Sequence, residues 1–151
     1  MESNGALSSN VVVQVGIVVR DIDRAREVFS KVLGVPVPDV IETAGQETAH
    51  TVYRGQPTDA RAKLAFFHTG TCAIELIEPI GGPSTWREQL ENHGNSIHHI
   101  AFQIRGMDGA IRSLKALGAE TVQRGDYTGG RYAYVDMTDA VGAVLELLEN
   151  D

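Results

Sequence analysis

Four polar side chains lie inside otherwise apolar, strand-like runs of this sequence. They are Gln14 in "VVVQVGIVV", Glu75 in "AIELIEP", His99 in "IHHIAFQI" and Glu146 in "VLELLEN". A carboxylate flanked by Ile and Leu is costly to bury unless it is paired or coordinates a cation. One imidazole, one amide oxygen and two carboxylates suit a six-coordinate divalent ion, and these ligands leave Zn²⁺, Ni²⁺, Co²⁺, Mn²⁺ and Mg²⁺ open. The predicted chemistry is that of a divalent metal site.

Each residue taken alone also has an ordinary structural explanation. Either glutamate could lie on a solvated sheet face, Gln14 could satisfy a backbone group, and a lone strand histidine is usually structural. An internal repeat favours a joint role, because "QVGIVVRDIDRA" (14–25) aligns without a gap on "HIAFQIRGMDGA" (99–110), at an offset of 99 − 14 = 85. The endings "AIELIEP" and "VLELLEN" also align, so Gln14 matches His99 and Glu75 matches Glu146.

Each copy of the repeat is predicted to be a βαβββ module. In the first copy a β-branched strand is followed by Asp21, which is expected to cap a helix that ends at "GVPVP". In the second copy the corresponding helix ends at Gly118, and three strand candidates follow. Two copies of this unit make the chain an α+β protein of two tandem modules.

Strand alternation places the four polar side chains on the sheet face that the helices do not cover. The helix-side positions of the opening strands are apolar: Val15, Ile17, Val19, Ile100, Phe102 and Ile104. Gln14 and His99 therefore face the other way, and Glu75 and Glu146 do so in the closing strands. Because neighbouring strand residues point to opposite faces, His98 is expected on the helix side, in a structural role.

The domain organisation follows from the repeat. Residues 1–10 are predicted to form a flexible tail, and residues 11–150 a single domain. Module one spans about 11–80 and module two about 96–150, joined by a connector helix at about 84–93 that starts at Ser84 and ends at Gly94. Residues 36–63 are predicted to hold a short strand in "DVIET", followed by a long loop or ragged hairpin.

Composition excludes several function classes. The formal charge of −7, with no cluster of Lys and Arg, argues against a nucleic-acid surface. No apolar run approaches the roughly 20 residues that a membrane span needs. The single cysteine, Cys72, cannot form an internal disulfide. We expect a cytoplasmic protein whose partner is a small molecule.

The motifs "IELIEP" (74–79), "HHIAF" (98–102) and "VLELLE" (144–149) resemble those of the vicinal oxygen chelate superfamily. The resemblance covers about Val11 to Asn150, and the run from "IELIEP" to "HHIAF" is most similar to methylmalonyl-CoA epimerases. It implies a curved mixed sheet around a cleft whose divalent metal is held by Gln14, Glu75, His99 and Glu146. Gln14 stands where epimerases usually have histidine and gives the ligand order of zinc-type glyoxalase I, although the glutathione-binding features of that enzyme are not matched.

The implied function is a metal-dependent isomerase, epimerase or lyase that moves a proton next to a metal-chelated carbonyl or carboxylate. Glu146 is the first candidate for the base and Glu75 for its partner across the substrate. Two alternatives stay open. One is a metal-dependent dioxygenase or antibiotic-modifying enzyme, and the other is a metal-free binding protein of the bleomycin-resistance kind.

Further polar residues are weaker candidates for contacts with an anionic substrate. They are Tyr53, Arg54, His68, Arg131, Tyr132 and Tyr134. Because one sheet face lacks a helix cover, association into a homodimer is also expected.

Overall fold

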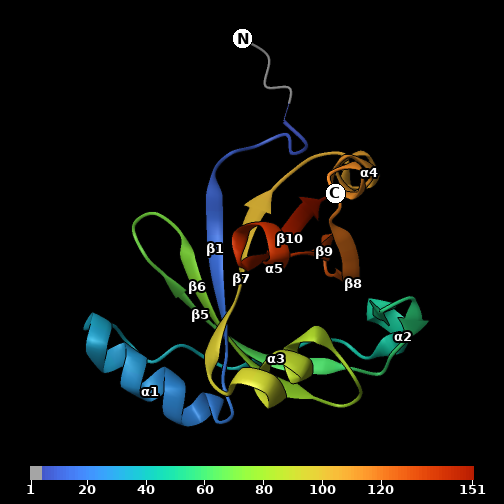
Figure 1. Cartoon of the computed structure of the whole chain (residues 1–151). Coiled ribbons are helices and arrows are strands. Elements are labelled where there is room, and N and C mark those ends of the chain that lie inside the picture. The colour runs from blue at the N-terminus through green and yellow to red at the C-terminus, as the bar shows by residue number, and fades with distance from the viewer. Residues whose placement is uncertain (1–4) are drawn as a thin grey trace.

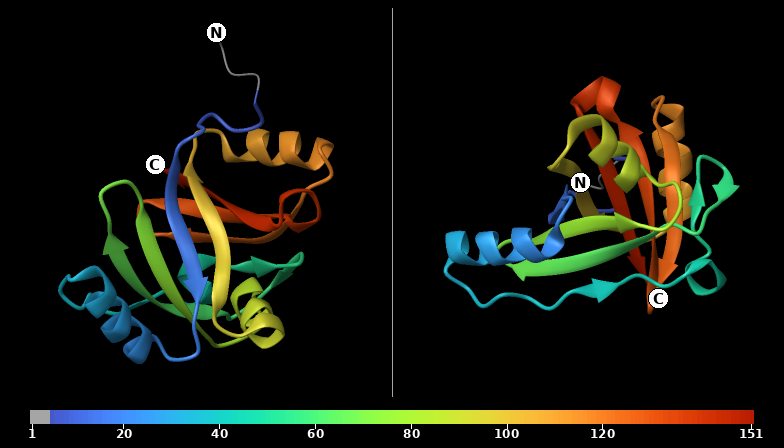
Figure 2. Two further views of the ribbon diagram at one scale, coloured as in Figure 1. Left: turned by 60° about the vertical axis from the view of Figure 1, so that its left-hand side comes forward. Right: turned by 90° about the horizontal axis from the view of Figure 1, so that it is seen from below.

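In the computed structural model, which describes residues 5–151, ten strands form one mixed sheet. Their order is β2-β5-β6-β1-β7-β10-β9-β8-β3-β4. The sheet is strongly curved, and β1 and β7 lie side by side at its centre (Figure 1, Figure 2). The predicted α+β fold with a curved mixed sheet is confirmed.

The two modules have matching arrangements in this sheet. The first comprises β1 (Val12–Val18), α1 (Ile22–Leu33), β2 (Ile41–Glu42), β5 (Arg61–His68) and β6 (Ala73–Ile80). The second comprises β7 (Ser96–Gln103), α4 (Met107–Ala116), β8 (Glu120–Tyr127), β9 (Gly130–Met137) and β10 (Ala143–Asn150). In both, the closing strand pairs in parallel with the opening strand, and the opening strands pair antiparallel with each other. The centre of the sheet therefore has approximate two-fold symmetry within one chain.

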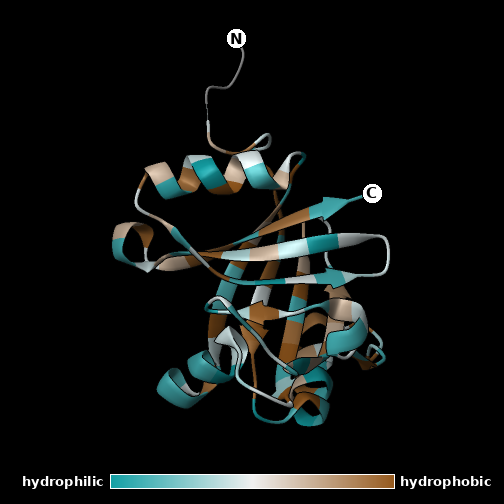
Figure 3. Ribbon diagram, turned by 90° about the vertical axis from the view of Figure 1, so that its right-hand side faces the viewer, coloured by the Kyte–Doolittle hydropathy of each residue, from teal (hydrophilic) through white to brown (hydrophobic). Residues whose placement is uncertain are grey.

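Helices α1 and α4 cover the outer face of the sheet, one in each module. Asp21 caps α1 as predicted, since its carboxylate accepts a hydrogen bond from the Arg24 amide at 3.1 Å, and Gly34 ends the helix at a φ of 68°. Alternating apolar and polar residues along α4 are seen in Figure 3. The two outer cores are built from the predicted helix-side positions, and their buried members include Val19, Ile22, Leu76, Ile104, Met107 and Leu147.

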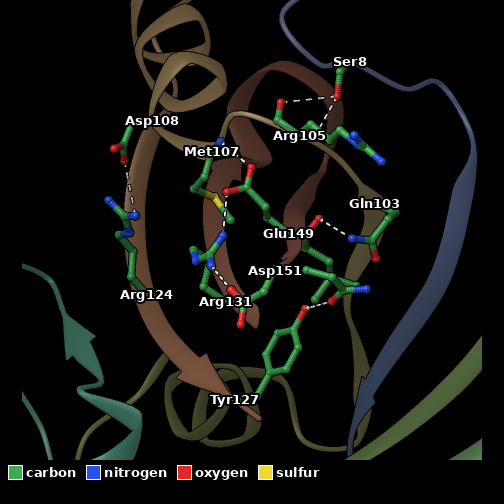
Figure 4. A network of polar contacts seen from close by, with 12 residues as sticks. Ser8, Gln103, Arg105, Met107, Asp108, Arg124, Tyr127, Arg131, Glu149 and Asp151 are labelled. Atoms are coloured by element: carbon green, nitrogen blue, oxygen red, sulfur yellow. Dashed lines mark hydrogen bonds and ion pairs between the residues drawn. The ribbon is translucent and has the colours of Figure 1, made fainter. Parts of the chain in front are cut away.

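The second glutamate of each repeated ending has a structural role. A carboxylate oxygen of Glu78 accepts a hydrogen bond from the Ile22 amide at 3.1 Å, at the first turn of α1. The matching Glu149 accepts one from the Met107 amide at 2.9 Å, at the first turn of α4 (Figure 4). An acidic group satisfies the unpaired amides of a helix start and interacts favourably with its dipole. Each module thus attaches its helix to its own closing strand.

The region predicted as a loop or ragged hairpin crosses from the first module to the second. It contains α2 (Gln46–Ala49), β3 (Val52–Tyr53) and β4 (Gln56–Pro57), and β3 pairs with β8. The connector helix α3 (Thr85–His93) begins at Ser84 as predicted and packs Trp86 and Leu90 on the inner face of the sheet. A short helix that the sequence did not predict, α5 (Thr138–Val141), joins β9 to β10.

Part of the predicted tail contacts the second module. Ala6 and Leu7 pack against the core around α4, and the Ser8 hydroxyl accepts a hydrogen bond from the Arg105 amide at 2.9 Å. Residues 1–4 of that prediction lie outside the described residues. Among the helices of residues 5–151, none is long and apolar enough to cross a membrane.

Candidate metal centre

The four predicted ligands come together on the inner face of the sheet, where β1 and β7 meet. In the strand register, Gly16 lies opposite both Glu75 on β6 and His99 on β7. At the symmetry-related position on β7, Ala101 lies opposite both Gln14 on β1 and Glu146 on β10. The four polar side chains therefore surround the symmetry axis, and each of the four central strands contributes one.

Short distances join these side chains. The Nε2 atom of His99 lies 2.9 Å from a carboxylate oxygen of Glu146 and 3.7 Å from one of Glu75. The same nitrogen lies 3.1 Å from the amide oxygen of Gln14. One ligand atom from each of Glu75, His99 and Glu146 falls within 4.8 Å of the others, so one ion could contact all three. The carboxylates and the imidazole are buried, with exposed fractions of 6%, 4% and 1% for Glu75, Glu146 and His99.

Gly16 makes room for the His99 ring. A Cβ atom on this glycine would lie 2.1 Å from Cε1 of His99 and 2.5 Å from both ring nitrogens. The imidazole therefore lies flat against the backbone of β1, which fixes where its Nε2 atom can be. The His99 ring thus explains why a glycine, which has no Cβ atom, interrupts the apolar run "VVVQVGIVV".

The cluster holds more negative charge than its own hydrogen bonds can compensate. Burial and the neighbouring Glu146 raise the pKa of Glu75 well above its ordinary value. One carboxylate oxygen of Glu146 has no hydrogen-bond partner among the described residues, because its contact with His99 lacks hydrogen-bond geometry. A buried, unpartnered carboxylate oxygen beside a second carboxylate, an imidazole and an amide oxygen fits a divalent cation.

The prediction that His98 and His99 point to opposite faces is wrong. Ile17 pairs with Ile97 and Gly16 with His99, so His98 is an extra residue in β7 and forms a β-bulge. The Nδ1 atoms of His98 and His99 lie 2.8 Å apart, with the rings perpendicular. His98 is nevertheless buried and packed as expected for a structural residue, and burial followed by the proximity of His99 holds its pKa well below the usual value.

A cavity of about 680 Å³ opens from the cluster, within the range for small-molecule sites. Gln14, Glu75 and Glu146 line it, and so do Tyr132 and Tyr134, two of the residues predicted to contact substrate. Most of its wall is aromatic or aliphatic. Sequence patterns did not identify several wall residues, which come from strand faces and loops that only the sheet topology brings together: Ile41, Leu64, Phe66, Trp86, Tyr127 and Leu148.

Two hydroxyls of the cavity wall are held in place by neighbours. The indole N–H of Trp86 donates to the Tyr134 hydroxyl at 2.9 Å, and the Gln123 amide donates to the Tyr132 hydroxyl at 3.0 Å. Burial and then the charges of Glu146 and Glu75 raise the pKa of Tyr134 well above its usual value, so this hydroxyl keeps its proton. Trp86, which packs the connector helix on the sheet, also contributes to the cavity wall.

The other four residues predicted to contact substrate lie outside this cavity, because their side chains have different partners. The Tyr53 hydroxyl and the Arg54 guanidinium bind the Glu88 carboxylate, the latter at 2.8 Å. Arg131 binds Glu149 at 2.6 Å and also Asp151 (Figure 4). His68 is exposed at the end of β5 and stacks on Phe66 at a centroid distance of 6.4 Å.

Comparison with known proteins places this geometry in context. A family model described as the glyoxalase/bleomycin resistance protein/dioxygenase superfamily matches residues 13–135. An uncharacterized protein of Bacillus subtilis (strain 168), YqjC, is 28% identical over 138 residues, covering 89% of each chain. The crystal structure of methylmalonyl-CoA epimerase from Mycobacterium tuberculosis matches with a TM-score of 0.65 and 23% identity, over 100% of this chain and 93% of that one. A variant Streptomyces coelicolor methylmalonyl-CoA epimerase, in complex with 2-nitronate-propionyl-CoA, gives 0.62 and 20%, over 92% and 93%. At these identities the two solved structures show the shared fold alone.

Proposed function

Since this chain belongs to the glyoxalase/bleomycin resistance protein/dioxygenase superfamily, we propose that it is a divalent-metal-dependent isomerase, epimerase or glyoxalase-type lyase. Its reaction moves a proton on the carbon next to a chelated carbonyl group. The observation that carries the proposal is the buried cluster itself, where two carboxylates, an imidazole and an amide oxygen converge on one point and, within residues 5–151, a carboxylate oxygen of Glu146 has no hydrogen-bond partner.

Gln14, Glu75, His99 and Glu146 are the proposed ligands. An ion held by these four residues would supply Lewis-acid stabilisation of the negative charge that develops on the substrate oxygen when the α-proton leaves. Two carboxylates neutralise a dication, so the site has no excess charge before substrate arrives. Zn²⁺, Ni²⁺, Co²⁺ and Mn²⁺ all accept this mixed nitrogen and oxygen set.

Glu146 and Glu75 are the proposed proton carriers. They come from β10 and β6, on opposite sides of the β1–β7 pair, so they flank a substrate placed over His99. We assign Glu146 to take the proton and Glu75, its partner across the substrate, to return one. Such a pair suits removal of the proton on one face and its replacement on the other.

The cavity wall supports a small carbonyl compound with an apolar body as substrate. Phe66, Tyr127 and Leu148 supply apolar surface, and the hydroxyls of Tyr132 and Tyr134 are candidates to orient oxygen atoms. A CoA ester is one candidate, because structurally similar epimerases have been crystallised with methylmalonyl-CoA or 2-nitronate-propionyl-CoA. The homodimer expected from the sequence stays a prediction.

Exchange of a substrate α-proton with solvent deuterium tests the proposal. Protein loaded in turn with Zn²⁺, Ni²⁺, Co²⁺ or Mn²⁺ is incubated in D₂O with methylmalonyl-CoA, or with the hemithioacetal of methylglyoxal and glutathione, and deuterium incorporation is followed by NMR. Glu146→Gln should abolish exchange. Glu88→Gln is the matched control, since Glu88 binds Tyr53 and Arg54 outside the cavity.

The outcomes separate the alternatives. Protein that takes up no metal, and gains no thermal stability from any of the four ions, would be a metal-free binding protein instead. Consumption of substrate only in the presence of oxygen would indicate a dioxygenase. Undiminished exchange in Glu146→Gln would exclude Glu146 as the base.

A further inference from the structure

A chain of hydrogen bonds runs from the metal-facing histidine to the first turn of α3. The Nδ1 atom of His99 lies 2.8 Å from Nδ1 of His98, and Nε2 of His98 lies 3.1 Å from the Thr85 hydroxyl oxygen. All three side chains are buried. Thr85 is itself fixed, because its amide donates to the Gln123 side chain at 2.9 Å and it begins α3 directly after the Ser84 cap.

The chain allows two proton arrangements. In the first, His99 donates from Nδ1 to His98, His98 donates from Nε2 to Thr85, and the Nε2 lone pair of His99 faces the carboxylates. In the second, every direction is reversed: the Thr85 hydroxyl donates to His98, His98 donates from Nδ1 to His99, and His99 donates from Nε2 to Gln14, 3.1 Å away. Both carry the same number of protons. A metal ligand needs its lone pair, so only the first is compatible with a bound ion.

The comparison between the modules shows that His98 is not needed to form the bulge. In β1 the pairing passes from Val12 with Phe102 to Gln14 with Ala101, so Val13 is bulged at the position that matches His98, since 98 − 85 = 13. The same backbone feature is therefore made with valine in the first module. A polar side chain occurs there only in the second module, behind a ligand whose second nitrogen requires a partner.

We infer that His98 and Thr85 are positioning residues that hold His99 in the tautomer required of a metal ligand, with Nδ1 protonated and the Nε2 lone pair directed into the cluster. This inference rests on the proposed function. In the metal-free protein the Gln14 amide oxygen, 3.1 Å from Nε2 of His99, favours the second arrangement, so metal binding should reverse the chain and turn the Thr85 hydroxyl from donor into acceptor. The Nδ1–H group of a ligating histidine usually donates to a carboxylate or a carbonyl oxygen. Here the acceptor is the neutral imidazole of His98.

Histidine tautomers in the Zn²⁺-loaded and metal-free protein test this directly. In long-range ¹H–¹⁵N spectra of protein labelled with ¹⁵N-histidine, we expect His98 to be protonated at Nε2 when Zn²⁺ is bound and at Nδ1 when it is absent. His98 protonated at Nδ1 in the Zn²⁺ form would refute the inference while leaving the metal site intact. Protein that binds no Zn²⁺ would refute the proposed function as well.

Substitutions supply a second readout, the dissociation constant for Zn²⁺ measured by competition with a chelator. His98→Phe keeps a ring against Tyr134 but removes the acceptor, and should weaken binding about 10- to 100-fold. Thr85→Val keeps the shape and removes the hydroxyl, so a smaller loss is expected, and Thr85→Ser should restore wild-type affinity. Equal affinity in Thr85→Val and Thr85→Ser, with both folded by circular dichroism, would show that the hydroxyl has no part in holding His99.

Discussion

Replacing Gly16 with alanine should break the metal site without changing any ligand. The new methyl carbon would lie 2.1 Å from Cε1 of His99, whereas ordinary contact begins at 3.4 Å. The ring must therefore move by about 3.4 − 2.1 = 1.3 Å, or the β1–β7 pairing must open. Metal–ligand distances tolerate only about 0.2 Å, so the shifted Nε2 atom cannot serve the same ion. We expect Zn²⁺ or Mn²⁺ affinity to fall by at least two orders of magnitude.

Stability measurements separate the clash from a general effect on the strand. Overpacking of this kind costs about 1–3 kcal/mol, to be measured by urea unfolding of the metal-free protein. In a His99→Ala background the clash is gone, and Gly16→Ala should instead be neutral or stabilise by about 0.5–1 kcal/mol, because alanine loses less conformational entropy in a strand. Ala101→Gly, at the symmetry-related position, is the matched control and should retain metal binding. Wild-type metal affinity in Gly16→Ala, or the same stability change in both backgrounds, would refute this account of the site.

Three further predictions follow from the charges and caps. Because the folded-state pKa of Glu75 is raised above its ordinary value of 4.5, the metal-free protein should lose stability as pH rises from about 4.5 through that raised pKa. Metal affinity should increase over the same range; the thermal midpoint and chelator competition measure the two effects. Glu146→Gln removes the buried carboxylate whose charge helps to raise the pKa of Glu75, so it should raise the thermal midpoint of the metal-free protein at pH 7, and a lowered midpoint would contradict the charge argument. Glu78→Gln and Glu149→Gln, which weaken the bonds to the first turns of α1 and α4, should each lower the free energy of unfolding measured in urea while leaving metal affinity unchanged.

The sequence could predict that Gln14, Glu75, His99 and Glu146 lie together because a duplication converts single residues into pairs. Strand alternation and the offset of 85 residues were enough to predict that Gln14 and His99 occupy matching positions on the same face of the sheet. Those rules are local, and the parts that were missed depend on pairing between distant strands. The crossing of β3 onto β8 is one example, since nothing in "TVYRGQP" indicates a partner about 70 residues away in the second module.

The error over His98 has the same origin. Alternation holds only while two strands stay in register, and the register between β1 and β7 shifts by one residue at His98. A bulge is hard to recognise in an apolar strand sequence, because the extra residue is of the same residue types that occur in a regular strand. The repeat gives no warning either, since Val13 looks like any apolar strand residue although it is bulged in the same way.

The two halves of the site differ at three positions, and the differences are connected. The ring of His99 packs against Gly16, and its Nδ1 atom contacts His98. Gln14 instead lies opposite Ala101 and next to Val13, the bulged residue of β1. An imidazole ligand is wide, so it needs a position without Cβ beneath it, and it has a second nitrogen that must be satisfied when buried. A glutamine ligand imposes neither demand at these two places. If His99 is a ligand as proposed, Gly16 and His98 are both requirements of its ring, and the departure from two-fold symmetry follows from placing a ring in only one of two equivalent positions.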